Sequence, residues 1–312
     1  MRAGARIAAF VGALVIVFAG AALAGGAIEP RGDQPGGDDG PRADHGPAGR
    51  DGHADPGEDA PAGDHGAAPA AGEGHPVRGL AVAEDGLRMV VDDPELRRGR
   101  DETLRFRIVG EDGLTVRDFD VTHERRMHLI VARRDLTGFR HLHPVMDADG
   151  RWSTPLRLDE AGSYRVFADF SHEDAAITLA ADLRVDGAAD LRPLPEAEPT
   201  GVSDGGYDVR LDAGHARAGR ESELRFAVTK DGAAVHTEPY LGAGGHLVAL
   251  REGDLAFLHV HPTEHGHGDA SAHDDTIGFA ATFPTEGRYR LFLQFKHEGR
   301  VHTVAFTQEV SR

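Results

Sequence analysis

The chain has 312 residues, which suits about two domains, and 34 Lys+Arg against 52 Asp+Glu give it a formal net charge of −18 at pH 7. This charge repels phosphate backbones and therefore argues against nucleic-acid binding. The chain contains no cysteine, so disulfides, thiolate metal sites and cysteine nucleophiles are excluded.

Residues 1–26 have the pattern of an export signal or a membrane anchor. A basic start precedes an apolar run at residues 7–24, which ends in the small-residue triplet Ala22-Leu23-Ala24 that is typical of a cleavage site. The run is also about as long as a minimal membrane span, so an uncleaved anchor stays open. Either alternative predicts an extracytoplasmic protein, secreted or held at the membrane by residues 7–24 alone.

Residues 27–77 are rich in Gly, Pro, Asp and His and show no hydrophobic period. Such a segment buries too little apolar surface to offset the entropy of ordering it, which predicts a disordered tether. Scattered histidines can hold metal loosely, but a solvated spacer is the simpler interpretation.

From residue 78 the chain changes to short apolar runs, rich in β-branched and aromatic residues and separated by turn signals. This pattern indicates strands rather than helices, and it predicts an all-β domain over residues 78–187. The strands expected in this domain lie at residues 87–91, 104–109, 128–132, 139–143, 164–170 and 177–185.

A linker at residues 188–203 precedes an internal duplicate of this domain at residues 204–312. The phrase Glu286-Gly-Arg-Tyr, for example, repeats Ala161-Gly-Ser-Tyr 125 residues later. Its glycine and tyrosine, followed by a phenylalanine, are typical of the strand that enters the corner of an immunoglobulin-like sandwich. We therefore expect two tandem immunoglobulin-like, or cupredoxin-like, β-sandwich domains after the tether.

Each repeat carries three histidines with the same spacing. They are His128, His141 and His143 in the first repeat and, 118 residues later, His246, His259 and His261 in the second. Without a thiolate, two or three imidazoles prefer Cu(II) or Zn(II), and copper binds more tightly. We therefore predict a copper or zinc ion at each set. No nucleophile elbow, Gly-rich phosphate loop or His-Glu-x-x-His helix accompanies them, so we expect no enzymatic activity.

The hairpin that would carry each set decides whether its rings converge. In the second repeat, a two-residue loop at Gly253-Asp254 would place His246 opposite His261 and all three rings on one face. In the first repeat this loop centre is missing, so the register is less certain there. A slip of one residue would send His128 to the opposite face.

Several other residues are weaker candidates for metal ligands. They are Met127, His172, His265, His267, His273 and His297. His172 and His297 share a Phe-x-His-Glu phrase, for which a surface turn is the simpler explanation. The alternative for the main sets is structural, because each ring could brace its hairpin by bonding a neighbouring carbonyl group.

The His-Leu-Ile-Val and His-Leu-His-Pro phrases of residues 125–144, and the matching phrases of residues 240–262, resemble a group of exported actinobacterial proteins usually labelled secreted or heavy-metal-binding. The resemblance covers residues 78–312. The labels of this group imply little about function. The repeated histidine sets predict a protein that buffers the ion at the cell surface or hands it over, with an envelope metal transporter or chaperone as the candidate partner. The alternative is an envelope interaction or structural module that binds no metal.

Overall fold

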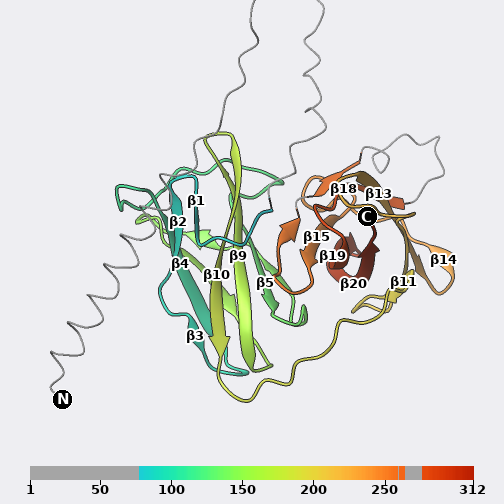
Figure 1. Cartoon of the computed structure of the whole chain (residues 1–312), viewed down its shortest axis with the longest axis horizontal. Helices are drawn as coiled ribbons and strands as arrows, with labels where there is room; N and C mark the ends of the chain where they lie inside the picture. The colour runs from blue at the N-terminus through green and yellow to red at the C-terminus, as the bar shows by residue number, and fades with distance from the viewer. Residues whose placement is uncertain (1–76, 259, 264–275) are drawn as a thin grey trace, which may run out of the picture. The chain divides into compact units, whose positions relative to one another are not determined.

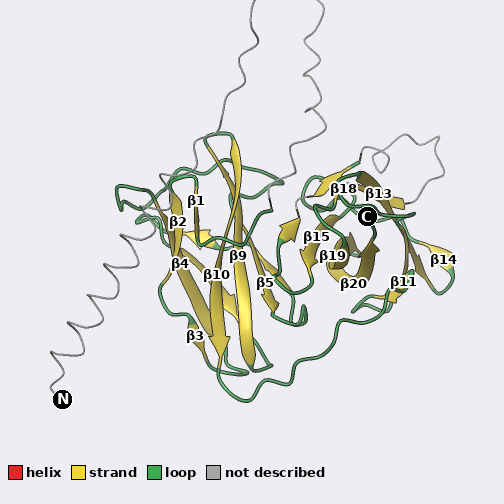
Figure 2. Ribbon diagram, in the orientation of Figure 1, coloured by secondary structure: helices red, strands yellow, loops and turns green. Residues whose placement is uncertain are grey.

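The computed structural model describes residues 77–258, 260–263 and 276–312, and strands are the regular elements of this part of the chain (Figure 2). Within these residues, no helix is long and apolar enough to cross a bilayer. The signal or anchor expected at residues 1–26, and the expected tether up to residue 76, lie outside the described part of the chain.

The first repeat forms two sheets built from β1 to β10 (Figure 1). The bounds are β1 Ala83–Glu84, β2 Leu87–Val91, β3 Glu95–Leu96, β4 Glu102–Val109, β5 His128–Arg133, β6 Arg140–Leu142, β7 Val145–Met146, β8 Trp152–Leu156, β9 Gly162–His172 and β10 Ala175–Val185. One sheet has the order β1-β2-β4-β8-β7 and the other β3-β10-β9-β5-β6. Every strand expected from the sequence is present, although β6 is shorter than expected.

The second repeat repeats this arrangement with β11 to β20. The bounds are β11 Thr200–Val202, β12 Asp208–Asp212, β13 Glu221–Lys230, β14 Ala233–Ala234, β15 His246–Arg251, β16 Phe257–Leu258, β17 Val260–Pro262, β18 Thr276–Thr282, β19 Gly287–His297 and β20 Arg300–Val310. One sheet has the order β11-β12-β13-β18-β17 with β14 beside β13, and the other β16-β15-β19-β20. Two tandem all-β sandwiches are thus confirmed. β11 lies inside the expected linker but pairs with β12, so it belongs to the second sandwich.

Each sandwich has a core of its own, formed by alternate residues of its strands. In β4, Leu104, Phe106 and Ile108 are buried, whereas the residues between them are more exposed. Successive side chains of a strand point to opposite faces, so this alternation buries one apolar face of the sheet. β13 shows the same pattern.

β5 differs from β4 because it is buried on both faces. Leu129 and Val131 lie in the core of the first sandwich, whereas Ile130 and Ala132 lie in a separate apolar cluster. This inter-repeat cluster contains Ile130, Ala132, Leu136, Phe167, Ala180, Leu194, Val248, Leu250, Leu255, Phe257 and Phe292. It is therefore shared by both sandwiches, which belong to one compact unit, Ala67–Arg312.

Two aromatic pairs cross the inter-repeat cluster. Phe139 stacks on Phe292 with ring centroids 4.1 Å apart and planes 8° from parallel. Phe257 meets Phe167 at 5.6 Å with an angle of 46°. Phe257 is the counterpart of Phe139 at the offset of 118, and Phe292 is the counterpart of Phe167 at the offset of 125. The two repeats therefore meet through equivalent surfaces, as the subunits of a two-fold symmetric dimer do.

Candidate metal centre

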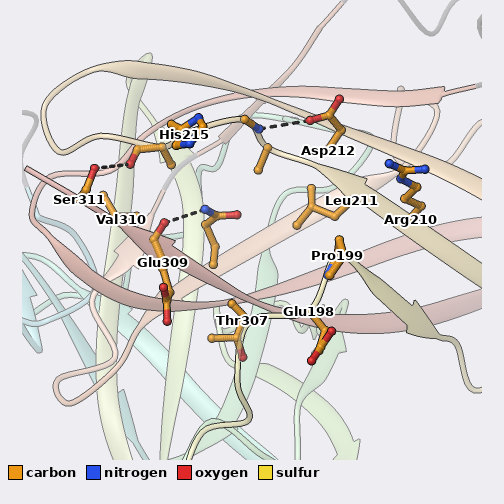
Figure 3. A pocket seen from close by; sticks show the side chains of 15 residues that line it. Glu198, Pro199, Arg210, Leu211, Asp212, His215, Thr307, Glu309, Val310 and Ser311 are labelled. Atoms are coloured by element: carbon orange, nitrogen blue, oxygen red, sulfur yellow. Dashed lines mark hydrogen bonds between the residues drawn. The ribbon is translucent and has the colours of Figure 1, made fainter.

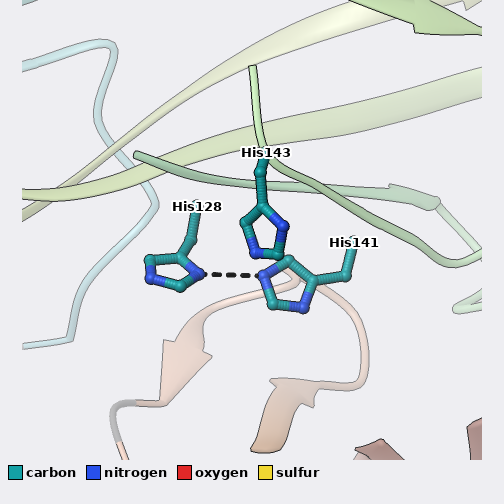
Figure 4. Close-up of side chains that lie close together, drawn as sticks. All are labelled: His128, His141 and His143. Atoms are coloured by element: carbon teal, nitrogen blue, oxygen red, sulfur yellow. Dashed lines mark hydrogen bonds between the residues drawn. The ribbon is translucent and has the colours of Figure 1, made fainter. Parts of the chain in front are cut away.

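The three histidines of the first repeat converge at the end of the β5–β6 hairpin. In this hairpin Ile130 pairs with His141 and Leu129 with Leu142, a register that puts His128 and His143 on the same face as His141. One ligand atom from each of the three rings lies within 4.8 Å of the other two (Figure 4). Among the described residues, this triad is the only such group of three His, Asp or Glu side chains.

Hydrogen bonds on the outer sides of two rings set where their protons lie. The Nε2 atom of His128 donates to the carbonyl oxygen of Thr122 at 3.1 Å, and the Nδ1 atom of His141 donates to Oε1 of Gln294 at 2.6 Å. A neutral imidazole has one N–H group, so each ring has used its proton on an oxygen acceptor. The two inner nitrogens, Nδ1 of His128 and Nε2 of His141, then face each other at 3.0 Å with a lone pair each.

When both rings are neutral, no proton lies between these two inner nitrogens. A cation bound by both lone pairs would take its place. Two nitrogen ligands that each bind one zinc or copper ion at about 2.0 Å lie roughly 3 Å apart. The carbonyl of Thr122 and the amide of Gln294 would then act as the outer partners that fix the tautomer of a metal-bound histidine. The separation and the tautomers of His128 and His141 both fit an ion.

His143 supplies a third nitrogen that has no partner. Its Nε2 atom is buried and makes no hydrogen bond, which is uncommon for a buried polar atom in a folded protein. Its ring centroid lies 4.8 Å from that of His141 and 5.2 Å from that of His128. The unpartnered nitrogen therefore belongs to the same small space as the two inner nitrogens.

The surroundings keep all three rings neutral. Burial, together with the charge that a protonated His128 would carry, lowers the pKa of His141 to about 3 and the pKa of His143 to about 4. Burial also lowers the pKa of His128, against the opposing effect of the Thr122 carbonyl. At pH 7 the lone pairs are thus available to a metal without competition from protons.

The second histidine set does not converge as predicted. The hairpin register is the expected one, since Ala249 pairs with Leu258, but the loop contains four residues between Arg251 and Ala256 instead of two. β16 ends at Leu258, two positions earlier in the repeat than β6 ends at Leu142. The chain then joins the other sheet as β17.

This early change of sheet separates the two described histidines of the second set. His261 pairs with Ala280 of β18 and its side chain is exposed. His246 stays on β15, opposite Gln294 of β19, and its ring lies against the first repeat's triad, 4.8 Å from His141 and 5.6 Å from His128 between centroids. The idea of one complete set per sandwich is therefore wrong for the described residues. His259 lies outside them.

The weaker candidates have other places in the structure. Met127 is buried in the core of the first sandwich, on the opposite face of the chain from His128. His172 bonds the carbonyl oxygen of Asp118 through Nδ1 at 2.9 Å, and His297 bonds the hydroxyl of Tyr207 at 2.9 Å. His265, His267 and His273 lie outside the described residues.

Sequence reasoning missed the side chains that surround the triad from elsewhere. Gln294 is one of them, and His123 is another, with its ring 6.1 Å from both His128 and His246. A signal for Gln294 was present, because it interrupts the apolar phrase Leu-Phe-Leu-Gln-Phe of a strand expected to be buried. A polar residue in such a strand usually has a specific partner.

An open groove on the surface of the second sandwich, separate from the triad, is lined by one histidine. Arg210, His215 and Glu309 are among its lining residues, and its bonds include one from Ser311 to the carbonyl oxygen of Ala216 at 3.4 Å (Figure 3). His215 is exposed there. Among the described residues of the groove, no three side chains converge as metal ligands.

A family model described as "Domain of unknown function (DUF8832)" matches the sequence twice, at residues 81–187 and at residues 201–312. The chain belongs to the DUF8832 family. Each DUF8832 match corresponds to one β-sandwich, and each begins within a few residues of the first strand of its sandwich. The family description carries no function, so the function has to be argued from the site.

No curated protein matches this DUF8832 chain. Among solved structures, the Escherichia coli adhesin FdeC matches at 14% identity, covering 74% of this chain and 66% of that chain with a TM-score of 0.26. Salmonella alpha-2-macroglobulin matches at 16% identity, covering 76% of this chain but 15% of that chain with a TM-score of 0.26. Domains 4 and 5 of the S-layer protein SbsC match at 11% identity, covering 74% of this chain and 100% of that chain, with a TM-score of 0.23. The DUF8832 chain thus spans less than two thirds of the first two proteins, and scores this low carry no argument about function.

Proposed function

We propose that the protein binds one transition-metal ion, copper(II) or zinc(II), at His128, His141 and His143. The observation that carries the proposal is the inner contact between His128 and His141, whose N–H groups are both used on outer acceptors. The unpartnered Nε2 atom of His143 adds a third donor. Neutral imidazoles suit both ions. By the Irving–Williams order, the site should bind copper(II) more tightly than zinc(II).

The role we propose is storage or transfer of the ion outside the cytoplasm rather than catalysis. The export pattern of residues 1–26 suits a place outside the cytoplasm. A chain of net charge −18 also raises the local concentration of cations around itself. An envelope transporter or metal chaperone would be the partner that supplies or receives the ion.

The rival role is structural, and one contact favours it. The nitrogens of His128 and His141 lie at hydrogen-bond distance, so the two rings could brace β5 against β6 without any ion. This bond requires either a protonated ring, which burial opposes, or a rotated Gln294 amide. Bracing would need no role for His143.

His143→Ala separates the two roles, because its Nε2 atom makes no hydrogen bond and its loss removes no brace. Calorimetric titration of the full chain with copper(II) and with zinc(II) should show one tight site that this variant loses or weakens by roughly tenfold or more. His215→Ala, an exposed histidine in the groove, is the matched control and should bind as the wild type does. All other histidines are common to the two variants.

Two results would contradict the proposal. One is a wild-type chain that takes up neither ion more tightly than a chain lacking all three triad histidines. The other is a His143→Ala variant that binds as well as His215→Ala, since His143 would then be no ligand and the three-histidine site would be wrong.

A further inference from the structure

We infer that His246 of the second repeat joins the triad of the first as the fourth ligand, so that one bound ion ties the two sandwiches together. This inference rests on the proposed metal site and adds a second-repeat ligand and a regulatory consequence to it. The number of ions per chain would then be one, although the sequence contains two histidine sets.

The triad leaves a coordination position open. A zinc site with a structural role is usually closed by four protein ligands, whereas the triad provides three. The ring of His246 packs on His141 at 4.8 Å and 26°, and on His128 at 5.6 Å and 11°. The ring of His246 thus lies against two members of the triad, and its binding to the same ion would require a change of its side-chain torsions.

The surroundings of His246 are not completely filled. A cavity of about 20 Å³ lies beside His246 and is lined also by His123 and Asp169, and a cavity of this size can hold about one water molecule. The ring of His246 therefore borders a small unfilled space on one side and the triad on another.

The backbone of the second repeat is adapted to place His246 there. Gly245 precedes it, and a Cβ atom at this position would lie 2.9 Å from the carbonyl oxygen of Gln294 and 3.1 Å from Cγ2 of Ile277. The absence of a side chain thus allows β15 to start close to β19, where His246 pairs with Gln294. The pairing of β15 with β19 thus places both the candidate ligand His246 and the acceptor for His141, Gln294, beside the triad.

The consequence is a link between metal binding and contact of the repeats. His128 lies on the β5 face that carries Ile130, and His246 lies on the β15 face that carries Val248, both of which belong to the inter-repeat cluster. An ion bound by His128 and His246 would bridge the edge of this cluster. Because a ligand stabilises the state that binds it, the ion would favour the docked arrangement of the two sandwiches.

The test uses the full chain and cobalt(II) as a visible stand-in for zinc, since four-coordinate cobalt(II) absorbs far more strongly than six-coordinate cobalt(II). Wild type should give the strong four-coordinate spectrum. His246→Ala and His246→Gln should both shift the absorption bands of cobalt(II), because water or another oxygen ligand would replace an imidazole, and should lower zinc affinity by roughly tenfold or more, while His215→Ala leaves both unchanged. The glutamine variant keeps the side chain polar and similar in size, so that agreement between the two variants excludes a packing effect.

Denaturant unfolding with and without zinc tests the link itself. The single tryptophan, Trp152, lies in the core of the first sandwich and reports on it, whereas circular dichroism reports on both sandwiches. Zinc should raise the denaturant midpoints of both signals together in the wild type. In His246→Gln it should raise the tryptophan midpoint and the part of the circular-dichroism change that comes from the first sandwich, so that the circular-dichroism transition separates into two steps.

The outcomes separate this inference from the metal site on which it rests. If the His246 variants keep the wild-type cobalt spectrum and zinc affinity, His246 is no ligand, yet the triad site stands. If the wild type itself gives no spectrum and binds no zinc, the triad site fails and the inference fails with it.

Discussion

The imidazole of His128 stacks on that of His246, its counterpart 118 residues later, with centroids 5.6 Å apart and planes 11° from parallel. Equivalent residues of two repeats meet in this way only when they lie near a local two-fold axis. The same axis relates the Phe139–Phe292 pair to the Phe257–Phe167 pair. The histidine centre thus lies where the repeats meet, and its behaviour should depend on both.

Gln294→Leu should weaken metal binding without touching any ligand. The amide oxygen of Gln294 accepts from Nδ1 of His141 at 2.6 Å and so keeps the lone pair of that ring on Nε2. Loss of such an outer partner typically lowers metal affinity by about 10–100-fold. Competition with a chromogenic chelator would measure the change, with Gln308→Leu on β20 as the control. Equal affinities for the two variants would show that Gln294 has no part in the site.

Phe292→Ala should weaken the contact between the repeats. The ring is 4% exposed and stacks on Phe139, and truncation of a buried phenylalanine costs about 3–5 kcal/mol. Guanidinium unfolding would measure the loss. Val145→Ala, at a position that is 72% exposed, should change stability by less than about 0.5 kcal/mol. Similar small losses for both variants would mean that the stacked pair contributes little to folding.

Asp135→Ala should destabilise the first repeat far more than Asp254→Ala, which removes the partner of Arg251, destabilises the second. Arg133 and Asp135 form an ion pair whose side chains are 2% and 4% exposed, whereas Asp254 is 41% exposed. Burial opposes ionisation of Asp135, but bonds from Arg133, Arg192 and Thr137 lower its pKa to about 2. A buried charge left without its partner costs about 3–5 kcal/mol, and an exposed pair is worth about 1 kcal/mol or less.

Urea unfolding of both variants would give the two values. A loss of less than about 1 kcal/mol for Asp135→Ala would mean that Glu160, which also lies 3.0 Å from Arg133, compensates the charge by itself.

The stability of the metal-free protein should fall as the pH falls from 7 to 5. The pKa of His141 is lowered to about 3 and that of His143 to about 4, while unfolding returns them to about 6.5. The unfolded chain therefore takes up protons that the folded chain does not, starting near pH 6.5, and each such proton lowers the free energy of unfolding by about 1.4 kcal/mol per pH unit. This loss of stability is absent above about pH 7, and it stops growing near the pKa values that the two histidines have in the folded chain.

Denaturant midpoints across pH 7 to 5 would check this dependence. His143→Ala should have a shallower slope than wild type, and exposed His215→Ala should keep the wild-type slope. A slope that is the same in all three proteins would mean that the triad rings titrate normally.

The hairpin register was predictable from the sequence in the second repeat alone, where Gly253-Asp254 marks the centre, and the sheet that follows each hairpin was not predictable in either repeat. The first repeat lacks this loop centre, so its register was left open. The pairing of Ile130 with His141 is what puts His128, His141 and His143 on one face. The departure of the chain after Leu258 depends on hydrogen bonds to β18, the next strand along the chain but a member of the other sheet. No local pattern reports such a choice between two sheets.

The sequence contained an indication of the inter-repeat cluster, but not in the alternation of apolar and polar residues. In the phrase His-Leu-Ile-Val-Ala of β5, apolar residues occupy consecutive positions, which suits a strand buried on both faces. An antiparallel sheet with one solvated face would alternate instead. The run therefore indicated a second layer over β5, but periodicity alone cannot say that the layer is the other repeat.

The like-to-like pairing of the phenylalanines has a meaning for the origin of the chain. A surface that matches its own copy is what a homodimer buries, and joining two such copies in one polypeptide leaves the matching surfaces in place. After fusion, the two halves associate within one chain. The short connection then sets their effective concentration, which no longer depends on how much protein the cell makes. Once the two halves were joined, they no longer had to be identical. One half could then keep three imidazoles at the site while the other contributed a single imidazole ring to it.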